Sequence, residues 1–117
     1  MGLLKKAKEE VVLQPVEDGL WAGSNIVEVF DTSGRTRMSC GIHELFASDT
    51  LVEAAPVDDV LYILEGEIEI QAGGISQTYH AGDFVYLFAG FEQRFIVREH
   101  VKHVYVCYPS NWKSEEE

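Results

Sequence analysis

The chain has 117 residues, 46% of them hydrophobic, and a formal net charge of −11. This length fits one domain with its own hydrophobic core. Because phosphate groups are bound by clustered Lys and Arg, the acidity argues against DNA, RNA and anionic membrane surfaces as partners. No apolar run approaches the ~20 residues that cross a bilayer, and the N-terminus lacks the apolar stretch of a secretory signal. We therefore expect a cytoplasmic protein.

The first half of the chain predicts a short N-terminal segment followed by strands. Residues 1–10 mix Leu, Lys and Glu and are compatible with one or two helical turns. Residues 25–30 are rich in β-branched and aromatic side chains, as strands are. The turn cluster at residues 31–34 and the strand at residues 35–45 complete a predicted hairpin. A short strand at residues 51–53 is expected to end before Pro56.

The second half predicts a succession of short strands separated by glycine turns. Turns are expected at Glu65-Gly66, Gly73-Gly74 and Ala81-Gly82-Asp83. The strands are predicted at residues 60–64, 67–72, 75–80, 84–87, 94–97 and 102–108. Nine or ten short strands with turn signals every 8–12 residues predict an all-β sandwich or barrel. The expected organisation is an N-terminal segment and first strand region over residues 1–24, a barrel over residues 25–112 and an acidic tail over residues 113–117.

Two sequence segments resemble the motifs of a known protein family. Residues 59–66, Asp-Val-Leu-Tyr-Ile-Leu-Glu-Gly, resemble the end of the first motif of the cupin superfamily, and residues 82–90, from Gly to Gly, resemble the second. The resemblance extends over roughly residues 25–112. It implies a single small cupin barrel of the jelly-roll type. It also implies a homodimer, because small cupins tend to cover their sheet edges by pairing.

The metal-binding residues of such motifs are replaced in this chain. Where cupins usually carry three histidines and one glutamate, the sequence has Glu53, Ala55, Asp59 and Gln93. Two carboxylates and an amide bind transition metals poorly and hold hard cations only weakly. We therefore expect no tightly held metal, and at most a weakly bound divalent cation.

Two cupin subfamilies share this loss. The chain resembles ethanolamine-utilisation cupins in its acidic pair Asp58-Asp59 and in its ending Tyr108-Pro109-Ser110-Asn111-Trp112. It resembles ureidoglycine-aminohydrolase-type cupins over residues 84–108. It departs from the first group at His43, where an aromatic residue is usual, and from the second at His103, where a lysine is common.

The candidate site follows from the resemblance, which implies a ligand inside the barrel near one opening. Asp59 and Glu53 are the first candidates, because two carboxylates in an apolar barrel can hold an amine or act as acid and base. Tyr105 joins them as a catalytic candidate on the last strand, where the resemblance favours its face as the inward one. The ligand-binding candidates are Gln93, His43, His103 and Phe95, the histidines because they titrate near neutrality.

Three functions remain open at this point. The first is a small-molecule-binding cupin of the ethanolamine-utilisation type, with a small polar or amine metabolite as its ligand. The second is a metal-dependent cupin enzyme, an aminohydrolase or isomerase, with the same residues around one cation. The third is a non-catalytic regulatory or scaffold cupin that acts through its dimer surface, which a solidly packed barrel would favour.

Overall fold

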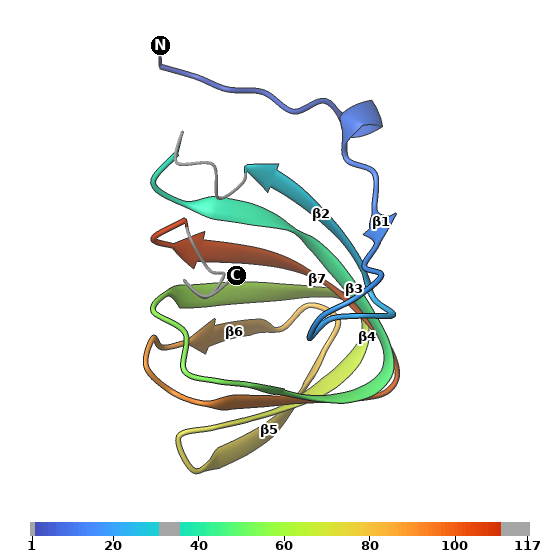
Figure 1. The fold of residues 1–117 in the computed structure, drawn as a ribbon, viewed down its shortest axis with the longest axis vertical. Helices are drawn as coiled ribbons and strands as arrows, with labels where there is room; N and C mark the ends of the chain where they lie inside the picture. Colours follow the sequence, from blue (N-terminus) through green and yellow to red (C-terminus); the bar gives the residue numbers. More distant parts are fainter. Residues whose placement is uncertain (1, 31–35, 111–117) are drawn as a thin grey trace.

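The computed structural model describes residues 2–30 and 36–110 (Figure 1). The predicted turn at residues 31–34 and the acidic tail at residues 113–117 lie outside these ranges. Within the described ranges, a 3₁₀ turn forms near the N-terminus and every other element is a strand. In chain order the elements are η1 (Lys8–Glu10), β1 (Gln14–Pro15), β2 (Asn25–Phe30), β3 (Ser39–Val52), β4 (Asp58–Ala72), β5 (Ile75–His80), β6 (Phe84–Leu87) and β7 (Gln93–Tyr108).

The strands form one antiparallel sheet that folds back on itself into two layers. Its order is β1-β2-β3-β7-β4-β5, and β6 pairs with β4. The long strands β3, β4 and β7 run through both layers and curve between them (Figure 1). The first part of β4 lies between β6 and the end of β7, and its last part lies between β5 and the start of β7. This arrangement confirms the predicted all-β barrel.

Three predicted pairs of short strands are single long strands. The predicted turn at Glu65-Gly66 is a bulge inside β4, where the register with β7 shifts on both sides of this pair. Gly66 has a φ of 81°, and a Cβ there would lie 2.0 Å from the carbonyl oxygen of His100. Only glycine tolerates both this positive φ and the close approach of the neighbouring backbone. The bulge that it permits bends β4 without reversing the direction of the chain.

The strands β3 and β7 contain similar bends. The predicted strand at residues 51–53 is the end of β3, which shifts register against β7 between Phe46 and Ser48. The predicted strands at residues 94–97 and 102–108 both belong to β7. Charged and polar residues near these bulges resemble loop sequences, although each strand continues and its pairing resumes beyond the bulge. The prediction of nine or ten short strands was therefore wrong in number.

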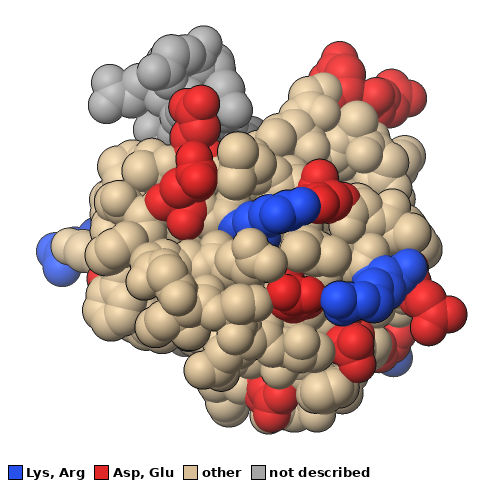
Figure 2. Space-filling model, turned by 90° about the horizontal axis from the view of Figure 1, so that it is seen from below, with Lys and Arg blue, Asp and Glu red and all other residues tan. Residues whose placement is uncertain are grey.

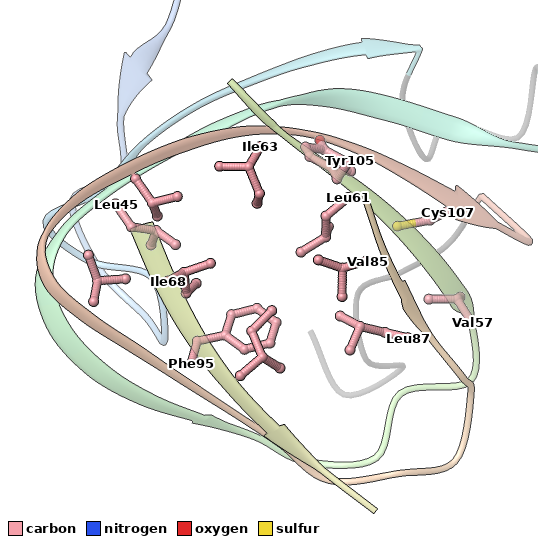
Figure 3. Packing of buried hydrophobic residues seen from close by; sticks show 13 residues of the cluster. Leu45, Val57, Leu61, Ile63, Ile68, Val85, Leu87, Phe95, Tyr105 and Cys107 are labelled. Atoms are coloured by element: carbon pink, nitrogen blue, oxygen red, sulfur yellow. The ribbon is translucent and has the colours of Figure 1, made fainter. Parts of the chain in front are cut away.

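The core lies between the two layers. Leu61, Ile63 and Tyr105 approach it from one layer, and Ile68 and Phe95 approach it from the other (Figure 3). Acidic side chains are dispersed over the face in Figure 2, some of them beside basic ones, with wide uncharged stretches between. No helix among the described residues is long and apolar enough to cross a membrane.

The segment before β2 positions an aromatic side chain over the barrel. Gln14 pairs with Ile26, so β1 extends the sheet beyond β2. The loop that follows is closed by two backbone hydrogen bonds, from Val16 N to Ser24 O at 2.8 Å and from Gly23 N to Val16 O at 3.0 Å. Trp21 lies within this loop and packs against the core cluster.

Candidate functional site

A cavity opens between the two layers. Its volume is about 80 Å³, well below the ~300 Å³ of pockets for drug-sized ligands. The strand β7 contributes residues from both of its halves, because it runs through both layers. The lining residues are Trp21, Ile26, His43, Val52, Ala55, Val57, Asp59, Leu61, Gln93, Phe95, His103, Tyr105 and Cys107.

Most of the predicted site residues share this cavity. Strand alternation turns Gln93 and Phe95 inward together on the first half of β7, and His103 and Tyr105 on its second half. The sequence alone did not determine which face of that second half points into the barrel. The candidates that line the cavity are Asp59, Tyr105, Gln93, His43, His103 and Phe95; their roles remain predictions.

Glu53 does not lie in the cavity. It directly follows Val52, the last residue of β3, whose side chain lines the cavity. Because successive side chains point to opposite sides of an extended chain, Glu53 is exposed to solvent. Ala55, two residues further on, lines the cavity in its place. The expected pair of converging carboxylates is therefore reduced to Asp59.

Asp59 has a buried carboxyl group, one oxygen of which makes no hydrogen bond with the described residues. It stands opposite Cys107 in the β4–β7 register. Burial raises the pKa of Asp59 to about 7, although hydrogen bonds from the Cys107 thiol and the Val106 backbone favour its charged form. Its Oδ1 is enclosed and has no hydrogen-bond partner among the described residues. A group in this state changes its charge readily when a ligand approaches.

His43 is held in one tautomer by a short chain of hydrogen bonds. The Ser24 hydroxyl donates to the carbonyl oxygen of Trp21 at 2.6 Å and lies 2.8 Å from Nε2 of His43. A serine hydroxyl has a single proton to donate, so it accepts from His43, whose proton lies on Nε2. Burial and the neighbouring His103 lower the pKa of His43 to about 3. The imidazole is therefore neutral, and its Nδ1 is an acceptor.

His103 is neutral in the complementary tautomer. Its Nδ1 lies 3.3 Å from the carbonyl oxygen of Val104, which only accepts, so the proton lies on Nδ1. Burial lowers the pKa of His103 to about 4. Its Nε2 is buried without a hydrogen-bond partner in the described part of the chain. The ring lies 5.7 Å from that of His43, centroid to centroid.

Tyr105 is a neutral phenol packed onto the backbone of β3. A Cβ on Gly41 would lie 2.7 Å from the Tyr105 hydroxyl oxygen and 2.1 Å from the carbonyl oxygen of Val27. Glycine at this position therefore makes room for the ring. Burial raises the pKa of Tyr105, which keeps the hydroxyl protonated across the physiological range.

Trp21 is the lining residue that the sequence analysis missed. Its ring lies 5.0 Å from that of His43 in an edge-on arrangement and 5.5 Å from that of Phe95. It forms part of the wall beside the two imidazoles. The available signal was a lone tryptophan between glycines, Gly19 and Gly23, just before the first long strand.

The donor set does not fit a tightly bound transition metal. Of the four motif positions, Ala55, Asp59 and Gln93 line the cavity and Glu53 lies outside it. Among the residues that the structure describes, no three His, Cys, Asp or Glu side chains come together as a metal site. Tight centres of this kind use three or four such ligands.

Comparison with known proteins places these observations in a family. The family model described as "Ethanolamine utilisation protein EutQ" matches residues 23–114. A relative from Clostridioides difficile (strain 630), named "Acetate kinase EutQ", is 24% identical over 88 residues, which make up 75% of this chain and 55% of that protein. The chain thus spans about half the length of this relative.

Solved structures agree on the fold. A putative ethanolamine utilization protein Q from Salmonella typhimurium LT2 superposes with a TM-score of 0.76 at 18% identity, covering 90% of this chain and 85% of that one. An RmlC-like cupin from Shewanella frigidimarina gives a TM-score of 0.74 at 15% identity, covering 91% and 90%. The predicted resemblance to cupins, and to the ethanolamine-utilisation group among them, is confirmed.

Proposed function

Since the chain belongs to the EutQ family of ethanolamine utilisation proteins, we propose that it is a small-molecule-binding cupin. Its ligand is a small polar or amine metabolite held in the barrel cavity. One observation carries the proposal: Asp59 Oδ1 and His103 Nε2 are buried, belong to residues that line the cavity and have no partner among the described residues. Because an unpaired buried polar atom costs about 1–3 kcal/mol, a polar ligand that pairs with them gains that energy.

Phosphoryl transfer is less well supported for this barrel. The relative that bears the name of a kinase is about twice as long as the part it shares with this chain. Enzymes that transfer phosphate surround it with Lys, Arg or Mg²⁺, and the lining residues include neither Lys nor Arg. A cavity of about 80 Å³ also suits a metabolite better than a nucleotide.

The other two functions receive less support from the same cavity. A metal-dependent aminohydrolase or isomerase needs ligands that converge on one ion, and Glu53 lies outside. In a purely structural cupin, buried acceptors without a partner, such as Asp59 Oδ1 and His103 Nε2, would lower the stability of the fold without serving a function. We further propose that the protein acts in the cytoplasm, as a homodimer.

Native mass spectrometry of the purified protein tests the binding role. We expect a small non-covalent adduct on the wild-type protein, retained by Glu53→Gln and lost or reduced at least tenfold in Asp59→Asn. The two variants make the same carboxylate-to-amide change, one outside the cavity and one inside it. Equal adduct levels in both variants would count against a site at Asp59.

A further inference from the structure

The two imidazoles that line the cavity, His43 and His103, are held so that each presents only a hydrogen-bond acceptor. We propose that the cavity is selective for small organic ammonium ions, whose nitrogen pairs with Asp59 while further N–H or O–H donors of the ligand reach the neutral imidazoles of His43 or His103. The inference rests on the proposed function and adds to it the charge and the hydrogen-bonding polarity of the ligand.

The imidazoles provide the first argument. The proton of His43 is directed to the hydroxyl oxygen of Ser24, and that hydroxyl donates its hydrogen bond to the carbonyl oxygen of Trp21. The proton of His103 faces the carbonyl oxygen of Val104. Each ring therefore presents one nitrogen lone pair and no remaining donor, and the ring of His103 is buried, with the residue at 2% exposure.

The charges around Asp59 provide the second argument. The titratable groups near it are Cys107, Tyr105 and His103 on β7 and His43 on β3, and none of them carries a positive charge at neutral pH. An anion entering the cavity would meet no cation. An ammonium ion supplies the opposite charge that Asp59 lacks, so it stabilises the carboxylate.

The walls provide the third argument. Trp21 and Phe95 place aromatic rings beside the polar groups, and the face of an aromatic ring attracts a cation by about 0.5–2 kcal/mol. The small volume limits the ligand to a few heavy atoms.

Proton release follows from this mode of binding. Where Asp59 is protonated in the free protein, the ammonium ion binds the carboxylate and the carboxyl proton passes to the solvent. One proton is then released for each ligand bound. The release falls toward zero at a pH where Asp59 is already ionised.

Matched probes test the inference by fluorescence. Trp112→Phe leaves Trp21 as the sole tryptophan, because the chain has two. At pH 7 we expect ethylammonium to perturb Trp21 fluorescence with an affinity at least tenfold higher than ethanol, which has the same number of heavy atoms, and higher than acetate. Asp59→Asn should abolish this preference, and Glu53→Gln should retain it.

Calorimetry on the wild-type protein adds a readout that needs no substitution. Titration of ethylammonium in two buffers of different ionisation enthalpy should show close to one proton released at pH 6 and almost none at pH 9.

Binding of ethanol or acetate as tight as that of ethylammonium would overturn the inference and leave the proposed function standing. Failure of all three probes together with the absence of any co-purified adduct would count against both. Stoichiometric Zn²⁺ bound through His103, with no response to ethylammonium, would assign these acceptors to a metal and would also overturn it.

Discussion

The burial of Asp59 lowers the stability of the folded protein at pH values where its carboxyl group is ionised. Its folded pKa of about 7 lies above its ordinary value of 3.8, so between these values the folded protein holds a proton that the unfolded chain releases. Its contribution to stability is therefore present at low pH and is lost as the pH rises toward 7. With ~1.4 kcal/mol for each unit of pKa, the rise from 3.8 to about 7 corresponds to a loss of about 4 kcal/mol.

Replacing this carboxyl by a neutral amide should recover that stability. We predict that Asp59→Asn is about 2–4 kcal/mol more stable than the wild type at pH 8, with an advantage that shrinks as the pH falls toward 4. Urea unfolding at several pH values measures this difference. A variant that is equally destabilised at pH 4.5 and pH 8 would contradict the raised pKa.

Ser24 connects the tautomer of His43 to the position of Trp21. Removing its hydroxyl leaves the buried Nε2 proton of His43 without an acceptor and the Trp21 carbonyl without this donor. We predict that Ser24→Ala costs about 1–3 kcal/mol and shifts Trp21 fluorescence to longer wavelengths. The matched control is Ser48→Ala, since the Ser48 hydroxyl makes a similar bond to Phe46 at an exposed site; a similar loss in both variants would argue against the chain of bonds.

The predictable part of the site comes from the regular strands. Strand alternation links Gln93 with Phe95, and His103 with Tyr105, so these pairs could be assigned to common faces before the structure was known. Glu53 could not be placed in this way, because it lies one residue past the end of β3. Outside a strand the side chains no longer alternate regularly, so its distance in sequence from the motif does not tell which way its side chain points. Trp21 was missed because a loop has no periodicity to analyse.

The bends of the long strands could not be predicted for a similar reason. A glycine inside a bulge and a glycine at a hairpin turn both adopt positive φ, as Gly66 and Gly74 do, each at 81°. Only the neighbouring chain distinguishes them: a Cβ on Gly66 would meet His100, whereas a Cβ on Gly74 has nothing within 4 Å.

This pair of glycines allows a controlled test of the bulge. We predict that Gly74→Ala costs about 1–2 kcal/mol, the price of a left-handed alanine, and that Gly66→Ala costs at least 2 kcal/mol more, because β4 and β7 must separate to relieve the contact. Thermal unfolding of both variants measures the difference. Equal losses would mean that the close approach of Gly66 to β7 does not limit the fold.

The molecule as a whole presents an aromatic surface on an edge strand. Phe84 and Tyr86 on β6, and Phe88 directly after it, are exposed, with Phe84 at 71%. Among the described strands, β6 pairs only with β4. Exposed apolar surface of this kind is typical of a contact between proteins. An edge strand is also a natural place for two copies to meet.

Light scattering coupled to size-exclusion chromatography tests the expected homodimer. We predict a dimer that is strengthened by salt, because each copy carries a net charge of −11 and salt screens the repulsion. Phe84→Glu should yield monomers with an unchanged circular dichroism spectrum. Ile75→Glu, at an exposed position on β5, should remain dimeric; a monomeric wild-type protein, or dimers of Phe84→Glu, would reject this surface.

We propose above all that the barrel interior is a receptacle for a small polar molecule centred on Asp59. A crystal structure of the protein soaked in ethylammonium tests it most directly. We predict density for the ammonium ion beside Asp59 Oδ1, within hydrogen-bonding distance and bounded by Trp21 and the two histidines. An interior closed by its own side chains, or a metal ion held at positions 53, 55, 59 and 93, would contradict it.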